Sequence, residues 1–171
     1  MIVADASPLI ALAKIQRLRL LSDLYGEAVI GPVVKAETID AGRAVRASGV
    51  EQIEAAVEDG WLRVVSLTAT ERGFMRRLTK RSRLDRGEAE SIAIADSRRL
   101  LLIVDDKEAR SVAATTGVQH VGTAGVLLEA FLRKRLDLDG LEAAVLDLSN
   151  VVWLSPAVVA EILKRARETK Q

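Results

Sequence analysis

Short apolar runs alternate with helix-like patterns along almost the whole chain, and this alternation limits the fold more than any other feature. Between the runs, apolar residues recur at helical spacing. Continuous apolar runs typical of buried strands cover residues 2–4, 28–30 and 101–104, and further strands are expected over the Val- and Leu-rich residues 61–67 and over residues 118–122. Because short buried strands separated by helices form parallel sheets covered on both faces, the sequence predicts a three-layer α/β/α fold with a central, mainly parallel sheet.

The length of the chain favours a single domain. Its 171 residues can bury a sizeable core but are too few for two domains of ordinary size. The alternating pattern covers residues 1–135, which we expect to form the α/β domain. Residues 136–171 are typical of a helical extension packed on that domain, with an extended piece near residues 151–154 between two helices.

Composition excludes several classes of protein. The chain has no cysteine, which rules out disulfides, thiolate metal sites and cysteine nucleophiles, and fits a reducing cytoplasm. Asp5 interrupts the apolar start of the chain within a few residues, so we expect neither a signal peptide nor a membrane span there. The expected location is the cytoplasm, without membrane contact.

Any binding of nucleic acid must come from local features. The net charge is only +1, and aromatic residues make up 3% of the chain, which disfavours binding by base stacking. Basic residues are concentrated in the segment 72–86, which could hold a phosphate backbone, although a solvated helix face or a strip that docks an acidic partner is a competing interpretation. The candidate phosphate-binding cations are Arg76, Arg77, Lys80, Arg83 and, one helical turn after Asp106, Arg110.

Four carboxylates lie where strands end or helices begin. Asp5 and Asp106 each follow an apolar run, Glu37 lies on a helix after the second run, and Glu88 begins the helix before the run at 101–104. The carboxyl ends of parallel strands share one edge of the sheet, so all four acids can approach a common point. Gathered acids repel each other unless a cation joins them, and oxygen ligands select Mg²⁺ or Mn²⁺. The pattern therefore predicts a divalent metal site.

Simpler interpretations exist for each acid taken alone, because helix caps and turns recruit acidic residues. Asp85 is a candidate cap for the helix that bears Glu88. Glu90, two residues beyond Glu88 on that helix, should face elsewhere. Asp105 and Asp106 are neighbours that point in different directions, so only one of them would be a direct ligand.

Several segments, taken in order, resemble a PIN domain. They are D-A-S-P-L-I at residues 5–10, Glu37, L-D-R-G-E-A-E-S-I-A-I-A at 84–95 and L-L-I-V-D-D-K-E-A-R at 101–110. They are most similar to a prokaryotic PIN subfamily with DxSPLI and GEAE motifs. The resemblance covers roughly residues 1–130, and it is much more specific than any one motif.

The resemblance implies a nuclease fold in which acids hold Mg²⁺ or Mn²⁺. Carried over by position, the metal-binding and catalytic acids are Asp5, Glu37, Glu88 and Asp106, the last preferred to Asp105 because it aligns with the family's fourth acid. Glu88 replaces the aspartate that is commoner in the toxin pattern. Ser7 matches a small hydroxyl that follows the first acid, and would contact a metal-bound water or the phosphate.

Many relatives of this type are VapC-like ribonuclease toxins paired with an antitoxin. We therefore expect a metal-dependent endoribonuclease in which a metal-bound water attacks phosphorus, with RNA, an antitoxin and a second copy of the chain as partners. The alternative is a PIN-shaped nucleic-acid-binding or regulatory module that has lost hydrolysis, which the Glu88 departure motivates. Phosphotransfer on small molecules is disfavoured because the chain has no glycine-rich phosphate loop.

Overall fold

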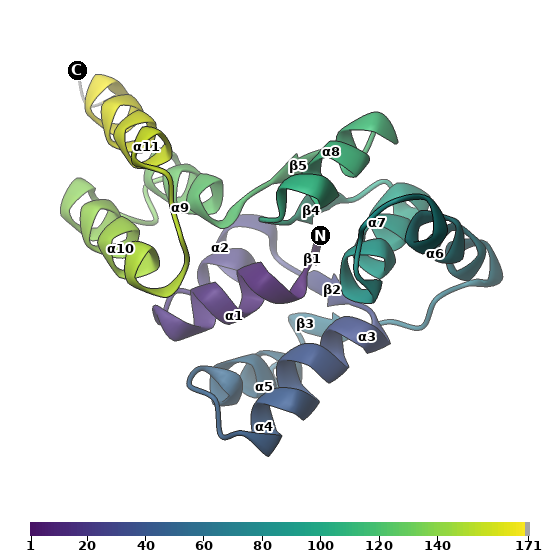
Figure 1. Ribbon diagram of the computed structural model, residues 1–171. Coiled ribbons are helices and arrows are strands. Elements are labelled where there is room, and N and C mark those ends of the chain that lie inside the picture. Colours follow the sequence, from purple (N-terminus) through teal and green to yellow (C-terminus); the bar gives the residue numbers. More distant parts are fainter. Residues whose placement is uncertain (170–171) are drawn as a thin grey trace.

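Five short parallel strands form the centre of the protein, and helices cover both faces of the sheet (Figure 1). The structure is a computed structural model and describes residues 1–169. The strands lie in the order β3-β2-β1-β4-β5 and all pair in parallel. They are β1 (Ile2–Ala4), β2 (Ala28–Ile30), β3 (Leu62–Val64), β4 (Leu101–Ile103) and β5 (His120–Val121). The predicted three-layer α/β/α fold is confirmed.

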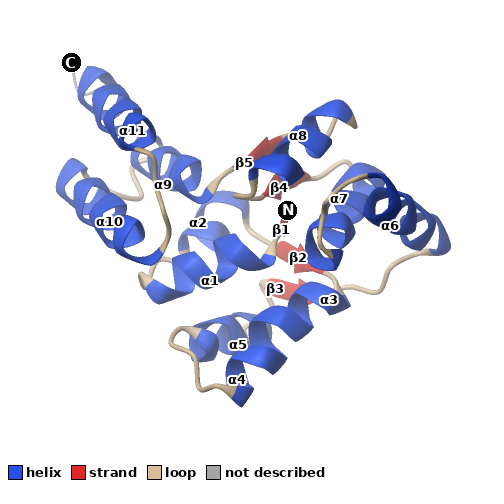
Figure 2. Cartoon of the chain, in the orientation of Figure 1, coloured by secondary structure: helices blue, strands red, loops and turns tan. Residues whose placement is uncertain are grey.

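Helices make up most of the rest of the chain, as Figure 2 shows. A short π-helical segment, η1 (Ala36–Asp40), joins α3 to α4. The helices are α1 (Ala6–Lys14), α2 (Leu20–Tyr25), α3 (Pro32–Lys35), α4 (Ala41–Ala44), α5 (Val50–Glu58), α6 (Ala69–Arg81), α7 (Arg86–Arg98), α8 (Lys107–Thr115), α9 (Thr123–Leu132), α10 (Leu138–Val151) and α11 (Pro156–Thr169).

Side chains of each central strand alternate between two apolar cores, because successive residues of a strand point to opposite faces. In β1, Ile2 and Ala4 join the core that includes α1, α2, α9 and α10, whereas Val3 joins the core under α6, α7 and α8. In β4, Ile103 and Leu102 divide in the same way. Burial on both faces explains why the strands read as unbroken apolar runs in the sequence.

The strand order reverses between β1 and β4. From β1 the chain moves outward through β2 and β3, then crosses back through α6 and α7 to place β4 on the other side of β1. In open parallel sheets, ligands bind beyond the carboxyl ends of the strands at such a reversal. Asp5 directly follows β1 and Asp106 lies just beyond β4, so both reach this point.

Several element boundaries differ from the sequence prediction. The strand expected over residues 61–67 ends at Val64, because β3 is an edge strand whose Arg63 and Val64 are exposed. Between β1 and β2 the chain forms two helices, α1 and α2, and Gln16 between them lies in the left-handed region at φ 56°. Gly49 adopts φ 89° immediately before α5 and separates this helix from α4.

The C-terminal helices share a core with the sheet. Leu141 and Leu148 of α10 and Ile162 and Ala166 of α11 are buried in the same apolar cluster as Ile2. The division of the chain at residue 135 into a domain and an extension stays a prediction. Within residues 1–169, no helix combines the length and the apolar character needed to cross a membrane.

Candidate active site

Asp5 is a buried carboxylate at the end of β1, and only 4% of the residue is exposed. It precedes α1 but makes no side-chain capping bond to that helix. Instead, the Ser91 hydroxyl on α7 donates to Asp5 Oδ1 at 3.2 Å. Burial raises the pKa of Asp5 from 3.8 to about 6, and the negative charges of Asp85 and Glu37 contribute to the increase. Keeping this acid buried therefore opposes its ionisation.

Glu88 lies in the first turn of α7, where it forms a reciprocal capping box with Asp85. The Asp85 N–H donates to Glu88 Oε2 at 2.9 Å, and the Glu88 N–H donates to Asp85 Oδ1 at 2.8 Å. Burial raises the pKa of Glu88 to about 7, and the charges of Asp85, Asp106 and Asp5 act in the same direction. Asp85 is thus a helix cap, as predicted, and also a member of the acidic cluster.

Glu37 reaches the start of α7 from η1. A Cβ atom added to Gly87 would lie 2.5 Å from Glu37 Oε2, so the carboxylate occupies space that only glycine leaves free. Partial burial raises the pKa of Glu37, and the nearby charge of Asp85 is the next largest cause. The π-helical turn that carries Glu37 is a rare conformation that recurs at functional sites.

The neighbouring acids after β4 have separate roles. Asp105 accepts bonds from the Thr123 N–H at 2.7 Å and the Thr123 hydroxyl at 2.6 Å, so its carboxylate holds the start of α9. Asp106 caps α8 by accepting from the Ala109 N–H at 2.9 Å, and its charge raises the pKa of Glu88. The structure therefore brings Asp106 toward the other acids and gives Asp105 a structural partner.

Four separate segments of the chain meet in one acidic cluster, which consists of Asp5, Glu37, Asp85, Glu88 and Asp106. Asp85 and Ser91 are the residues that the sequence prediction did not assign to this site. The D-x-x-E spacing of the capping box could have revealed Asp85, because it places two carboxylates in the same helix start. Ser91 could have been found from its position three residues after Glu88, on the same helix face.

The chemistry of this cluster suits a hard divalent cation. Its donors are carboxylate oxygens, and a cation between them would neutralise charges that now raise each other's pKa values. As the side chains are placed, no three acids within residues 1–169 stand close enough together to coordinate one ion. The donor set fits the metal in charge and ligand type, and the side chains would have to move together to share it.

Comparison with known families agrees with this arrangement. A family model described as a PIN domain matches residues 1–168. The chain belongs to the PIN-domain family. The match confirms the resemblance seen in the sequence, and it extends through α10 and most of α11. No curated protein matches the chain. Membership implies a nuclease-type fold associated with nucleic-acid binding, and PIN nucleases typically use divalent metals.

The predicted phosphate-binding residues of this PIN domain lie outside the acidic cluster. Ser7 is exposed in the first turn of α1, and Arg110 is exposed on α8. Arg76, Arg77 and Lys80 are exposed on α6, and Arg83 is exposed in the loop that follows it. Helix α6 packs along α7, as Figure 1 shows, and its C-terminal end leads into Asp85. Of these cations, Arg83 lies nearest in sequence to the acidic cluster, two residues before Asp85.

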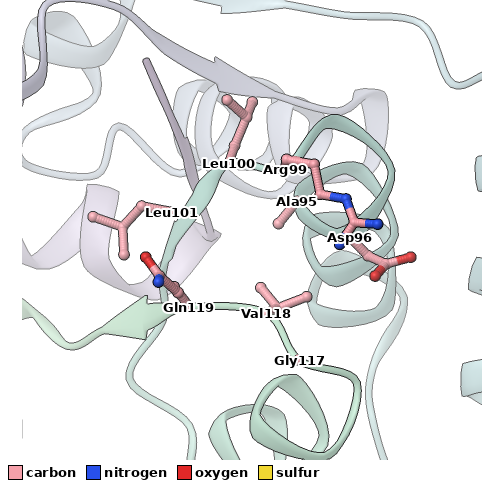
Figure 3. Close-up of a pocket in the computed structure, with 8 residues that line it drawn as sticks. All are labelled: Ala95, Asp96, Arg99, Leu100, Leu101, Gly117, Val118 and Gln119. Atoms are coloured by element: carbon pink, nitrogen blue, oxygen red, sulfur yellow. The ribbon is translucent and has the colours of Figure 1, made fainter.

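A cavity of about 280 Å³ lies at the other end of the sheet. Figure 3 shows its lining, which includes Asp96 and Arg99 from the end of α7, Leu101 at the start of β4, and Gln119 just before β5. These residues surround the amino ends of the strands, whereas the PIN-domain acids lie beyond the carboxyl ends. The cavity is therefore separate from the candidate active site.

Proposed function

We propose that this chain is an Mg²⁺- or Mn²⁺-dependent endoribonuclease that acts as the toxin of a toxin–antitoxin pair. The observation that supports this function is the convergence of carboxylates from four segments, close enough for each to raise the pKa of another. A cluster in which one acid is buried and the pKa values of three are raised is a candidate functional site. In a PIN domain, the function that suits such a cluster is metal-dependent hydrolysis of phosphodiesters.

Each acid would hold the cation from a different support. Asp5 is anchored by β1 and by the Ser91 hydroxyl, Asp106 by the first turn of α8, and Glu88 by the first turn of α7. Glu37 completes the set from η1. When bound, a divalent cation would polarise the phosphoryl oxygen and lower the pKa of a water molecule. The acids thereby bind and orient, and no side chain has to act as a nucleophile.

The exposed cations of α6 favour a polyanionic substrate. Within the described part of the chain, Arg76, Arg77, Lys80 and Arg83 take part in no salt bridge, so their charges are available to phosphate groups. Arg77 also lies 5.4 Å from the centre of the Phe74 ring, which holds its side chain along the helix surface. Contacts of this type position a nucleic-acid backbone and carry no sequence preference.

A protein partner would find apolar surface on the C-terminal helices. Trp153, in the loop between α10 and α11, is 85% exposed, and Leu146 of α10 is 64% exposed. We propose this region as the contact for an antitoxin or for a second copy in a homodimer. Light scattering of the purified chain, alone and with its antitoxin, measures both associations. A monomer that no antitoxin binds would contradict this part of the proposal.

One observation favours the alternative function, a nucleic-acid-binding or regulatory module without hydrolysis. Glu88 Oε2 is already used in the capping box, and the acids within residues 1–169 are too far apart to share an ion without rearrangement. Binding a cation would require the acid side chains to rearrange. If that rearrangement is too costly, the chain binds RNA and leaves it intact.

Cleavage of labelled RNA separates the two functions. We expect the protein with millimolar Mn²⁺ to cleave single-stranded RNA, with the activity removed by a chelator and by Asp5→Asn or Asp106→Asn. Asp137→Asn is the matched control, because Asp137 caps α10 through the Gly140 N–H at 2.7 Å, just as Asp106 caps α8. Both cap variants should keep nearly the stability of the wild type, because asparagine caps a helix about as well as aspartate does.

The outcomes are distinct. Loss of cleavage in Asp106→Asn but not in Asp137→Asn supports the nuclease, whereas full cleavage in both Asp5→Asn and Asp106→Asn refutes the assigned site. RNA binding without cleavage at any Mn²⁺ concentration favours the alternative module. A parallel assay with single-stranded DNA measures the preference between the two nucleic acids.

A further inference from the structure

Helix α7 carries a second acid, Glu90, whose surroundings differ from those of Glu88. Two residues along a helix correspond to a rotation of about 200°, so the two side chains leave opposite sides of α7. Glu90 is 2% exposed and contacts the start of α3, and its charge contributes to the raised pKa of Glu37. The proposed chemistry does not use this buried carboxylate.

Glu90 binds the start of α3 through the backbone. Its Oε2 accepts from the Val33 N–H at 2.9 Å and from the Val34 N–H at 3.1 Å. These amides belong to the first turn of α3, where N–H groups have no partner within the helix. Neither Gly31, the residue before α3, nor Pro32 supplies a side-chain cap, so Glu90 supplies the cap from a different helix.

The fit around this carboxylate is close. A Cβ atom added to Gly31 would lie 2.1 Å from the Glu90 carboxyl carbon, so only glycine fits at this position. The φ of Gly31 is −87°, which alanine adopts without strain. Gly31 is therefore required for space and not for its backbone conformation.

The helix that Glu90 holds continues into the segment bearing Glu37. Helix α3 runs directly into η1, and the Thr38 hydroxyl donates to the Val34 carbonyl oxygen at 2.8 Å, which joins the two segments. The Glu37 carboxylate in turn lies against Gly87, in the first turn of α7. Movement of α3 relative to α7 would therefore move Glu37 relative to Glu88.

We propose that Glu90 is a positioning residue, which locks α3 to α7 and so places Glu37 beside Glu88 in the acidic cluster. This inference rests on the proposed metal-dependent function. Glu88 and Glu90 of the GEAE segment then have complementary tasks: the first faces the metal, and the second fixes the helix that delivers another ligand. Partners that orient metal ligands commonly change metal affinity by 10- to 100-fold when they are removed.

The chain offers a matched control in Glu71. This carboxylate is also buried, at 1% exposure, and also caps a helix, accepting from the Thr68 N–H at 2.7 Å. It is paired with Arg98 at the far end of α7, about 15 Å along the helix axis from Glu88. Removing Glu71 should destabilise the protein without moving Glu37.

The test is titration of the purified full-length variants with Mn²⁺ by calorimetry, together with hydrogen exchange of the metal-free protein. In Glu90→Ala we expect the Kd for Mn²⁺ to increase about tenfold or more, and the amides of Val33 and Val34 to exchange faster. Glu90→Gln keeps one acceptor oxygen and should restore part of the affinity. Glu71→Ala should lower Tm. It should leave the Kd for Mn²⁺ and the exchange rates of the Val33 and Val34 amides unchanged.

A second variant keeps the inference testable if Glu90→Ala does not fold. Gly31→Ala should displace the carboxylate and weaken Mn²⁺ binding similarly. Where Glu90→Ala does fold, the two effects should not add in the double variant Glu90→Ala/Gly31→Ala. Wild-type affinity in Gly31→Ala and Glu90→Gln, or an equal loss in Glu71→Ala, overturns the inference alone. Absence of Mn²⁺ binding by the unmodified protein overturns the proposed function, and this inference with it.

Discussion

Replacing Asp5 with asparagine should stabilise the metal-free protein while removing its activity. The rise in the pKa of Asp5 from 3.8 to about 6 means that the folded state resists ionisation of this group. Each pKa unit corresponds to about 1.4 kcal/mol, so a charged Asp5 costs the folded state about 3 kcal/mol above pH 6. Asparagine keeps an oxygen that can accept from Ser91, but it buries an amide group, so we expect a net gain of about 2 kcal/mol at pH 8.

The sign of this effect defines its pH window. Between pH 4 and pH 6 the folded protein holds a proton on Asp5 that the unfolded chain has released, so stability falls as the pH rises through this range. Glu88, with a pKa of about 7, extends the fall toward neutral pH. At pH 4 or below, Asp5 is protonated in the folded protein, and the advantage of Asp5→Asn should disappear.

Thermal unfolding in a chelating buffer at pH 4 and pH 8 measures the prediction. A gain of about 2 kcal/mol corresponds to a rise in Tm of about 4 to 8 °C for a domain of this size. The exposed Asp147→Asn serves as a control that should change Tm little at either pH. With Mn²⁺ added, the wild type and Asp147→Asn should be stabilised further, and Asp5→Asn should not. If Asp5→Asn is less stable than the wild type at pH 8, the account of Asp5 as a strained, functional carboxylate is wrong.

Three further substitutions test other parts of the structure. Gly87→Ala would place a methyl group 2.5 Å from Glu37 Oε2, so we expect weaker Mn²⁺ binding by calorimetry with a small change in Tm. Arg77→Ala should weaken RNA binding for all sequences and reduce the slope of log Kd against log salt concentration by about 1, as measured by fluorescence anisotropy. Leu127→Ala removes a fully buried side chain of α9 and should lower the free energy of unfolding by about 2 to 5 kcal/mol in urea titrations.

The positions of the acids that follow strands could be predicted from the sequence, because the apolar run before each acid marks a buried strand and its direction. An acid that ends an apolar run lies at the carboxyl end of a buried strand, which is where Asp5 and Asp106 are found. The prediction that Glu90 faces away from Glu88 also follows from helix geometry alone, and it agrees with the contacts of Glu90.

Other features could not be predicted because they depend on residues distant in the chain. The bond from Ser91 to Asp5 spans 86 positions, and the bonds from Val33 and Val34 to Glu90 span 57 and 56. The same is true of exposure. The 85% exposure of Trp153 depends on how α10 and α11 pack, because they leave their connecting loop at the surface.

The order of expected strands and helices determined the layered parallel fold by itself, since the central strands β1, β2 and β4 are short, strongly apolar and closed by a turn or an acid. The sequence pattern also predicted that the candidate acids lie at one edge of the sheet. Only the tertiary structure decided what each carboxylate does, assigning Asp105 to Thr123, Asp85 to the acidic cluster and Glu90 to α3. The physical reason is that a carboxylate's role is set by the donors and charges within a few ångströms of it, and here those come from other elements of the fold.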